Sequence, residues 1–173
     1  MRAVPEASAV RVAEDFDDFY RREYTAVVGL TYALSGNRWT AEDLAQDAFL
    51  AAHRSWSRVS ELDRPDAWVR RVASNLAVSA FRRRLAEGRA LARVVLRQPP
   101  NVAELSADDA EFWRAVRALP RRQSQVIALF YLEDRPVLEV ADILDMAPGT
   151  VKKHLYDGRR ALARRLGYLE DER

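Results

Sequence analysis

The feature that most constrains the fold is a break within residues 136–166, between a short apolar segment and a longer basic one. One face of the first segment, Val137–Leu144, is apolar, because four side chains recur at helical spacing: Val137, Val140, Ala141 and Leu144. Pro148 and Gly149 are predicted to end this helix, since proline disfavours helical geometry in the residue before it. Thr150 is the expected N-cap of the helix that follows.

The second helix is predicted to carry two different faces. Its inward stripe contains Val151, Leu155, Gly158, Leu162 and Leu166. Its outward side contains Lys152, Lys153, Tyr156, Arg159 and Arg160. Two short helices, a tight turn and a cationic outer face indicate a helix-turn-helix whose second helix enters a major groove. An ordinary helical hairpin with a solvated basic face has the same pattern, so this segment alone leaves both interpretations open.

Composition narrows the class of protein. The 173 residues contain no cysteine, which excludes disulfides and thiolate zinc sites within this chain. No apolar run approaches the roughly 20 residues that span a bilayer, so we expect no membrane insertion. The first ten residues lack the continuous apolar stretch of a secretion signal, and the expected location is therefore cytoplasmic.

Amphipathic spacing elsewhere predicts an all-α chain of two small helical domains. A first helix should begin at Phe16 and end at Ser35-Gly36-Asn37, and further helices should cover residues 107–119 and 121–132. The predicted domains are residues 14–87 and 107–168, joined by a flexible linker over residues 88–106. Residues 1–13 and 169–173 are predicted to be tails.

The predicted helix over residues 41–56 has a face of mixed chemistry. Thr40 is its expected N-cap, with Asp43 as a capping-box partner. One side of the helix lines up Asp43, Gln46, Asp47, Leu50 and Arg54. This face is either a solvated surface or a docking site for a partner helix. A metal site is disfavoured, because no histidine or further acid stands at ligand spacing.

The helix predicted over residues 65–86 carries a basic stripe beside its core stripe. The expected core residues are Trp68, Val72, Leu76 and Ala80. The neighbouring stripe contains Arg71, Asn75, Val78 and Arg82, and it is extended by Arg83 and Arg84. Arginines and an amide around an exposed valine would suit melted, single-stranded DNA, although such a charge run is also typical of a solvated face.

Nothing in the chain favours catalysis. It has no glycine-rich phosphate loop, and neither of its two histidines, His53 and His154, stands near residues that would form a nucleophilic triad. We therefore expect no enzymatic activity and no cofactor.

Four segments in this order resemble the extracytoplasmic-function (ECF, group IV) sigma factors of bacteria. They read AEDLAQDAFLAAHRSW, DAWVRRVASNLAVSAFRRR, ALPRRQSQVIALFYLED and VLEVADILDMAPGTVKKHLYDGRRAL, and the resemblance runs from about Phe16 to Leu166. It implies that the chain binds core RNA polymerase and directs it to promoter DNA. An anti-sigma factor as a further partner is implied by the family alone.

The resemblance also implies roles for individual residues. The mixed face from Asp43 to Arg54 would dock on the clamp helices of the polymerase β′ subunit, and residues 107–166 would lean on the β flap. Melted −10 DNA would meet Arg71, Asn75, Arg82 and Arg83. At the −35 element we expect base contacts from Lys152, Lys153 and Tyr156. Phosphate contacts are expected from Arg122, Thr150, Arg159 and Arg160.

Several positions depart from the family pattern. Ser79 stands where the family commonly has an acidic residue, and Asp157 stands where it frequently has a basic residue. Lys153 and His154 replace a common serine-arginine pair. Asp145 replaces the usual turn glycine, which predicts a different turn conformation there. The promoter sequence that this chain recognises therefore does not follow from the sequences that its relatives recognise.

Two other classes of function would fit the same helices. A stand-alone helix-turn-helix regulator would bind duplex DNA as a dimer, without polymerase. A decoy protein would bind polymerase but support no transcription; the intact basic helix argues against it.

Overall fold

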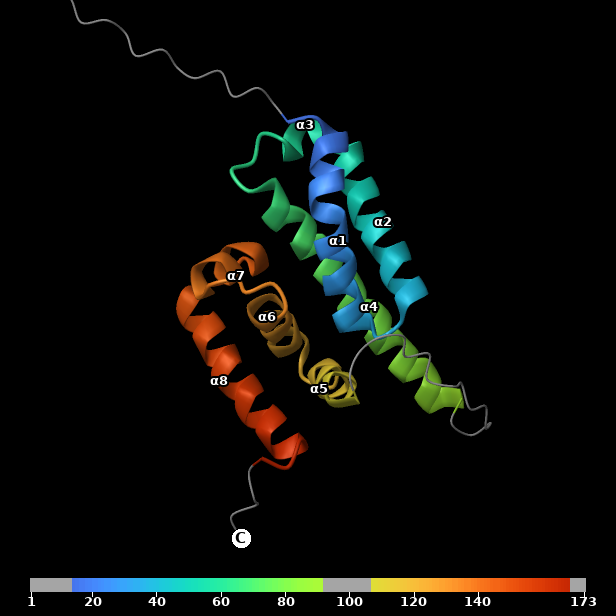
Figure 1. The fold of residues 1–173 in the computed structure, drawn as a ribbon, viewed down its shortest axis with the longest axis vertical. Coiled ribbons are helices and arrows are strands. Elements are labelled where there is room, and N and C mark those ends of the chain that lie inside the picture. The colour runs from blue at the N-terminus through green and yellow to red at the C-terminus, as the bar shows by residue number, and fades with distance from the viewer. Residues whose placement is uncertain (1–13, 92–106, 169–173) are drawn as a thin grey trace, which may run out of the picture.

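The computed structural model describes residues 14–91 and 107–168, and over these residues it is built of α-helices (Figure 1). The N-terminal unit contains α1 (Phe16–Ser35), α2 (Arg38–Arg54), the single turn α3 (Trp56–Val59) and α4 (Pro65–Leu91). The C-terminal unit contains α5 (Ala107–Arg117), α6 (Arg121–Tyr131), α7 (Val137–Leu144) and α8 (Pro148–Arg165). The all-α class is confirmed. The predicted tails, and all of the predicted linker beyond Leu91, lie outside the described residues.

In the N-terminal unit α1, α2 and α4 form a bundle in which each helix contacts the other two, and α4 crosses behind α1 in Figure 1. Their upper core is aromatic: Phe19 is fully buried and contacts Phe49 and Trp56 ring to ring. At the lower end of α1, Gly36 adopts the left-handed conformation (φ 73°), and its amide bonds to the carbonyl of Tyr32. This is the helix-ending position predicted for Gly36, because glycine enters that region without steric cost.

Two of the predicted helix starts are wrong. Asn37 is the N-cap of α2, and its side chain accepts a bond from the Thr40 amide at 3.0 Å, so Thr40 lies inside the helix. Pro148 begins α8 instead of breaking the chain, since proline suits the first helical position, where its missing amide hydrogen has no role. Thr150 therefore lies in the first turn of α8, and Ala147 precedes the helix without a side-chain cap.

The turn between α7 and α8 depends on Asp145. This residue adopts the left-handed conformation (φ 53°, ψ 59°) that a glycine would take, so the expected change in turn conformation does not occur. The Asp145 amide bonds to the Asp142 carbonyl at 3.3 Å, and the Met146 amide bonds to the Ala141 carbonyl at 3.0 Å. These two bonds are the pair that defines a Schellman ending.

The two units share a hydrophobic core. One continuous cluster of buried side chains joins Leu30 and Leu34 of α1 and Val78 of α4 to Val116 of α5 and Ile127 of α6. Helix α1 contacts α5 and α6, and α4 contacts α6 and α7 (Figure 1). The units are therefore packed against one another along α1 and α4.

Candidate nucleic-acid interface

The outward face of α8 is open. Lys152, Lys153, Tyr156 and Arg160 are exposed, and Tyr156 is 64% exposed. The apolar stripe behind them is buried at Val151, Leu155, Gly158 and Leu162, while Leu166 is only half-buried. Gly158 allows a close approach there, because a Cβ at this position would lie 3.1 Å from the Cγ1 of Ile127 of α6, which is tighter than most such contacts. The close contact fixes α8 on α6 with its cationic side facing outward.

Two of the predicted phosphate-binding arginines are held by neighbours. Arg159 donates from Nε to the hydroxyl of Tyr131 at 2.6 Å, and its guanidinium lies over the rings of Phe130 and Tyr131 at 5.3 and 5.5 Å. Arg122 donates to the Oε1 of Gln125 at 3.3 Å. Both arginines are still exposed, and Thr150 is exposed in the first turn of α8. All seven residues predicted to contact duplex DNA are thus at or near the surface of the C-terminal unit.

The mixed face of α2 is also open. Asp43, Gln46, Asp47, Leu50 and Arg54 are all exposed, with Leu50 50% exposed. Trp39 extends this face by one turn and is 72% exposed. It was not predicted as part of the face, although it precedes Asp43 by four residues, a spacing that places both on the same side of a helix. An exposed tryptophan and leucine among acids form a surface suited to a protein partner, since aromatic residues dominate binding hot spots.

The basic stripe of α4 is divided between solvent and the C-terminal unit. Arg82 and Arg83 are exposed, and Arg83 pairs with Glu87 at 3.9 Å. Val78, expected to be exposed, is 4% exposed and belongs to the core shared by the two units. The predicted core residues Trp68, Val72 and Leu76 are only half-buried. Val78 was therefore wrongly expected to be exposed, and the exposed part of the stripe lies at Arg82 and Arg83.

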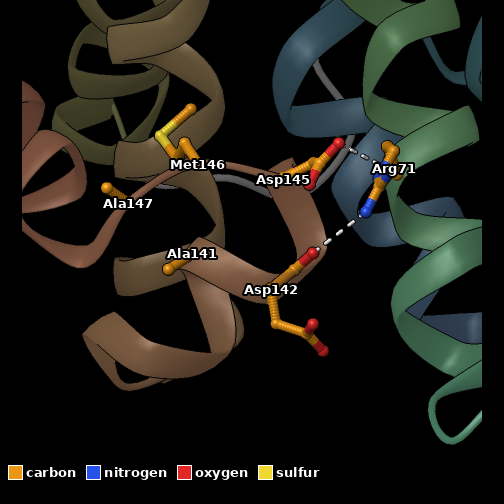
Figure 2. Close-up of a pocket in the computed structure, with 6 residues that line it drawn as sticks. All are labelled: Arg71, Ala141, Asp142, Asp145, Met146 and Ala147. Atoms are coloured by element: carbon orange, nitrogen blue, oxygen red, sulfur yellow. Dashed lines mark hydrogen bonds and ion pairs between the residues drawn. The ribbon is translucent and has the colours of Figure 1, made fainter.

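Arg71 reaches from α4 to the end of α7 (Figure 2). Its Nε donates to the carbonyl of Ile143 at 2.7 Å and its Nη2 to the carbonyl of Asp142 at 3.1 Å. Its Nη1 lies 3.6 Å from the carboxylate of Asp145. The last carbonyls of a helix have no partner within the helix and carry partial negative charge, so a cation stabilises them. Arg71 of one unit thus caps a helix of the other.

Asn75, one turn further along α4, is bound by α6. Its Oδ1 accepts from the Nη2 of Arg121 at 2.7 Å and from the Nε2 of Gln125 at 2.9 Å. Gln125 is fully buried and donates also to the Oγ of Ser74 at 3.1 Å. Two of the four α4 residues predicted to contact melted DNA, Arg71 and Asn75, therefore bind protein in this arrangement.

Charged side chains continue the contact between the units. Arg70, 2% exposed, pairs with Glu23 of α1 at 2.8 Å and with Glu133 of the α6–α7 loop at 2.5 Å. Burial acts to lower the pKa of Arg70, but the charges and hydrogen bonds of Glu133 and Glu23 raise it above its ordinary value. Arg64 pairs with Glu139 of α7 at 3.2 Å. This network keeps every buried charge near an opposite one, which burial requires.

Comparison with known proteins identifies the family. Residues 19–86 match Sigma-70 region 2, and residues 109–162 match Sigma-70 region 4. The chain is 30% identical to ECF RNA polymerase sigma factor SigM of Mycobacterium tuberculosis, over 97% of this chain and 87% of that protein. The chain belongs to the ECF RNA polymerase sigma factors. A second ECF sigma factor, SigW of Bacillus subtilis, is 26% identical over 88% of this chain and 87% of its own.

Solved structures show the same sigma-factor fold. The sigma factor RpoE of Bartonella quintana, in complex with the anti-sigma factor NepR, has a TM-score of 0.67 at 23% identity, covering 92% of this chain and 99% of that one. CnrH, in complex with the cytosolic domain of CnrY, has a TM-score of 0.62 at 22% identity, and the match covers 90% of this chain and 89% of that one. As an ECF sigma factor, the chain is an alternative sigma factor that directs RNA polymerase to promoters. Among the described residues no helix of this sigma factor is long and apolar enough to cross a membrane.

Proposed function

We propose that this sigma factor divides promoter recognition among three surfaces. The α2 face, from Trp39 to Arg54, binds the β′ clamp helices of core polymerase. The outward face of α8 reads the −35 element as duplex DNA, with Lys152, Lys153 and Tyr156 at the base edges. The α4 stripe, with Arg71, Asn75, Arg82 and Arg83, holds the melted −10 strand.

The observation that carries this proposal is the exposure of the α2 and α8 faces, which lie on different units of one chain. A cationic helix face with a projecting tyrosine suits a major groove, whereas a face of acids, tryptophan and leucine does not, because acids repel phosphate. Binding polymerase and DNA through separate surfaces raises the effective concentration of each contact for the other. The protein itself catalyses no reaction in this scheme and needs no cofactor. It acts in the cytoplasm, where polymerase is.

Arg82 and Arg83 of the α4 stripe are already exposed, whereas Arg71 and Asn75 become available only when the units separate. Asn75 and Arg71 cannot meet DNA while they bind Gln125, Arg121 and the end of α7. We infer that the closed arrangement is the resting form, and that binding to polymerase and promoter opens it. An anti-sigma partner remains an expectation from the family resemblance.

Run-off transcription with purified core polymerase tests the proposed function. Adding the protein should start transcripts at specific sites on a bacterial promoter library, and polymerase without the protein should not. A stand-alone dimeric regulator would instead bind duplex DNA tightly by itself, with half-sites about one helical turn apart, and would not start transcription. A decoy would bind polymerase yet yield no transcript. Either result would reject the proposal.

A further inference from the structure

Three arginines surround a cavity at the C-terminal end of α1, between the two units. The cavity has a volume of about 330 Å³ and is lined by Arg84 of α4, by Arg114 and Arg117 of α5, and by Ser35, Gly36 and Phe81. None of the described residues that line it is a carboxylate. This cluster is separate from the α2, α4 and α8 residues to which the proposed function assigns roles.

Two of the arginines are positioned by the end of α1. Arg117 donates from Nη1 to the carbonyl of Ala33 at 2.9 Å, and Arg84 donates from Nη2 to the carbonyl of Ser35. Gly36 leaves room for this arrangement, because a Cβ there would lie 2.8 Å from the Nε of Arg117. Arg114 is exposed at the rim of the cavity. The guanidinium groups of Arg84 and Arg117 are therefore held by backbone carbonyls.

The C-terminal end of α1 balances only a small part of the positive charge of the three arginines. The C-terminus of a helix carries about half an elementary negative charge, whereas the three guanidinium groups carry three positive charges. Burial lowers the pKa of Arg84 and of Arg117, and the charges of Arg114 and Arg84 lower that of Arg117 further. The Nε of Arg84 is buried without a hydrogen-bond partner. Like charges gathered in a recess repel each other when no carboxylate lies among the described lining residues, and a bound anion would relieve this repulsion.

We propose that the cavity binds a small phosphate-bearing molecule through its diphosphate or phosphate group. Guanidinium groups match phosphate oxygens with paired, charge-assisted hydrogen bonds, and the cavity is of the size of small-ligand sites. Phe81 and Leu85 add an apolar wall beside the arginines. Because Arg84 belongs to one unit and Arg114 and Arg117 to the other, the ligand would bridge the units and stabilise their closed arrangement.

Calorimetric titration of the full-length protein with inorganic diphosphate tests this site, at an ionic strength held constant with chloride. We expect saturable binding and a rise in melting temperature with diphosphate but not with chloride. Arg114→Gln should weaken binding about tenfold or more, because it removes one charged hydrogen-bond donor. This arginine is exposed and caps no helix, so the variant should fold normally.

Arg58→Gln is the matched control, since Arg58 is an exposed arginine of α3, near the opposite end of α1 (Figure 1). Its affinity for diphosphate should equal that of the unsubstituted protein. Absence of binding at millimolar diphosphate, or equal affinity in Arg114→Gln, would overturn the proposal. Arg114-dependent binding of a single-stranded DNA oligonucleotide without diphosphate binding would also overturn it, because the cluster would then be a DNA contact.

Discussion

The side-chain amide of Gln125 on α6 donates to the Oδ1 of Asn75 on α4, at 2.9 Å. Gln125 is fully buried, and the same Oδ1 also accepts from Arg121. Asn75 is our candidate for a residue close to the bases of the melted strand. Its carbonyl oxygen cannot serve α6 and a base together, so packing of the units and recognition of the −10 strand exclude one another.

Opening of the units should follow from loss of this contact. The double variant Arg121→Ala, Gln125→Ala removes both donors to Asn75, and we expect the free protein to bind a −10 single-stranded oligonucleotide several-fold more tightly. Fluorescence transfer between dyes on cysteines introduced at Arg58 and Lys153 would report the separation directly, because the natural chain has no cysteine. Arg164→Ala is the matched control, since Arg164 is an exposed arginine of the same unit to which no DNA contact is assigned. Unchanged transfer in the double variant would show that other contacts keep the units closed.

Asp145→Gly should distinguish the effect of backbone strain at this residue from the effect of its ion pair between the two units. Glycine takes the left-handed conformation of this residue without cost, which should raise the free energy of unfolding by up to about 1 kcal/mol. The same change removes the ion pair with Arg71, which is worth less because Asp145 is exposed. Urea unfolding should therefore show higher stability, while the dye pair reports slightly looser units. Asp145→Asn tolerates the conformation but lacks the charge, so it should loosen the units equally; a difference between the two variants would contradict this explanation.

Acid should weaken the closed arrangement through Asp66 at the start of α4. Burial acts to raise the pKa of its carboxyl, but two hydrogen bonds from Arg64 and the charges of Arg70 and Arg135 lower it below the ordinary value. A lowered pKa in the folded state adds stability that is complete above about pH 4 to 5 and is lost as the pH falls through the folded-state value. At pH 7, Asp66→Asn should reduce the free energy of unfolding by about 1–3 kcal/mol. Unfolding curves measured from pH 7 to pH 3 should converge for the two proteins; parallel curves would reject the assignment.

Binding to polymerase should depend on the charge of the α2 face. Asp47→Arg places a cation in the middle of this surface and should reduce affinity for core polymerase at least tenfold without changing the helical circular dichroism. Glu61→Arg makes the same charge reversal at an exposed site outside α2 and should bind normally. Equal affinity of both variants for core polymerase, measured by fluorescence anisotropy, would rule out docking through α2.

Promoter discrimination should depend on Lys152. Lys152→Ala should lower transcription from a promoter with an intact −35 element more than from one with a scrambled element, because a single lysine contact to a base discriminates by up to about 1 kcal/mol. Arg160→Ala, a proposed phosphate contact, should lower both and should reduce the slope of affinity against salt. Run-off transcription from paired templates measures the difference. An equal loss from both templates would make Lys152 a phosphate contact.

Local spacing was enough to predict most of the helices. The extents of α1, α5, α6 and α7 follow from apolar side chains that repeat every three or four residues, a property of each segment by itself. Helix starts were less certain. Asn37 and Thr40 are both good capping residues three positions apart, and only the bond from the Thr40 amide to Asn37 distinguishes them.

The covered part of the α4 stripe could not be predicted in this way. Val78 and Asn75 lie on a face that repeats like any solvated face, and it is α6, some fifty residues further along the chain, that covers them. Residue spacing within one helix contains no information on which distant helix will pack on it. The open faces of α2 and α8 were easier to predict, because nothing in the described part of the chain covers their charged residues.

Arg71 of the N-terminal unit completes the end of α7, and Arg117 of the C-terminal unit completes the end of α1. Each half of the protein thus donates to the end of a helix in the other half. A fragment cut between the halves would therefore lose one arginine donor at the end of α7 and one at the end of α1. If polymerase separates the halves, as we propose, the carbonyls that Arg71 and Arg117 bind must find new partners. These reciprocal arginine contacts thus link the stability of the closed arrangement to the free energy that polymerase binding must supply to open it.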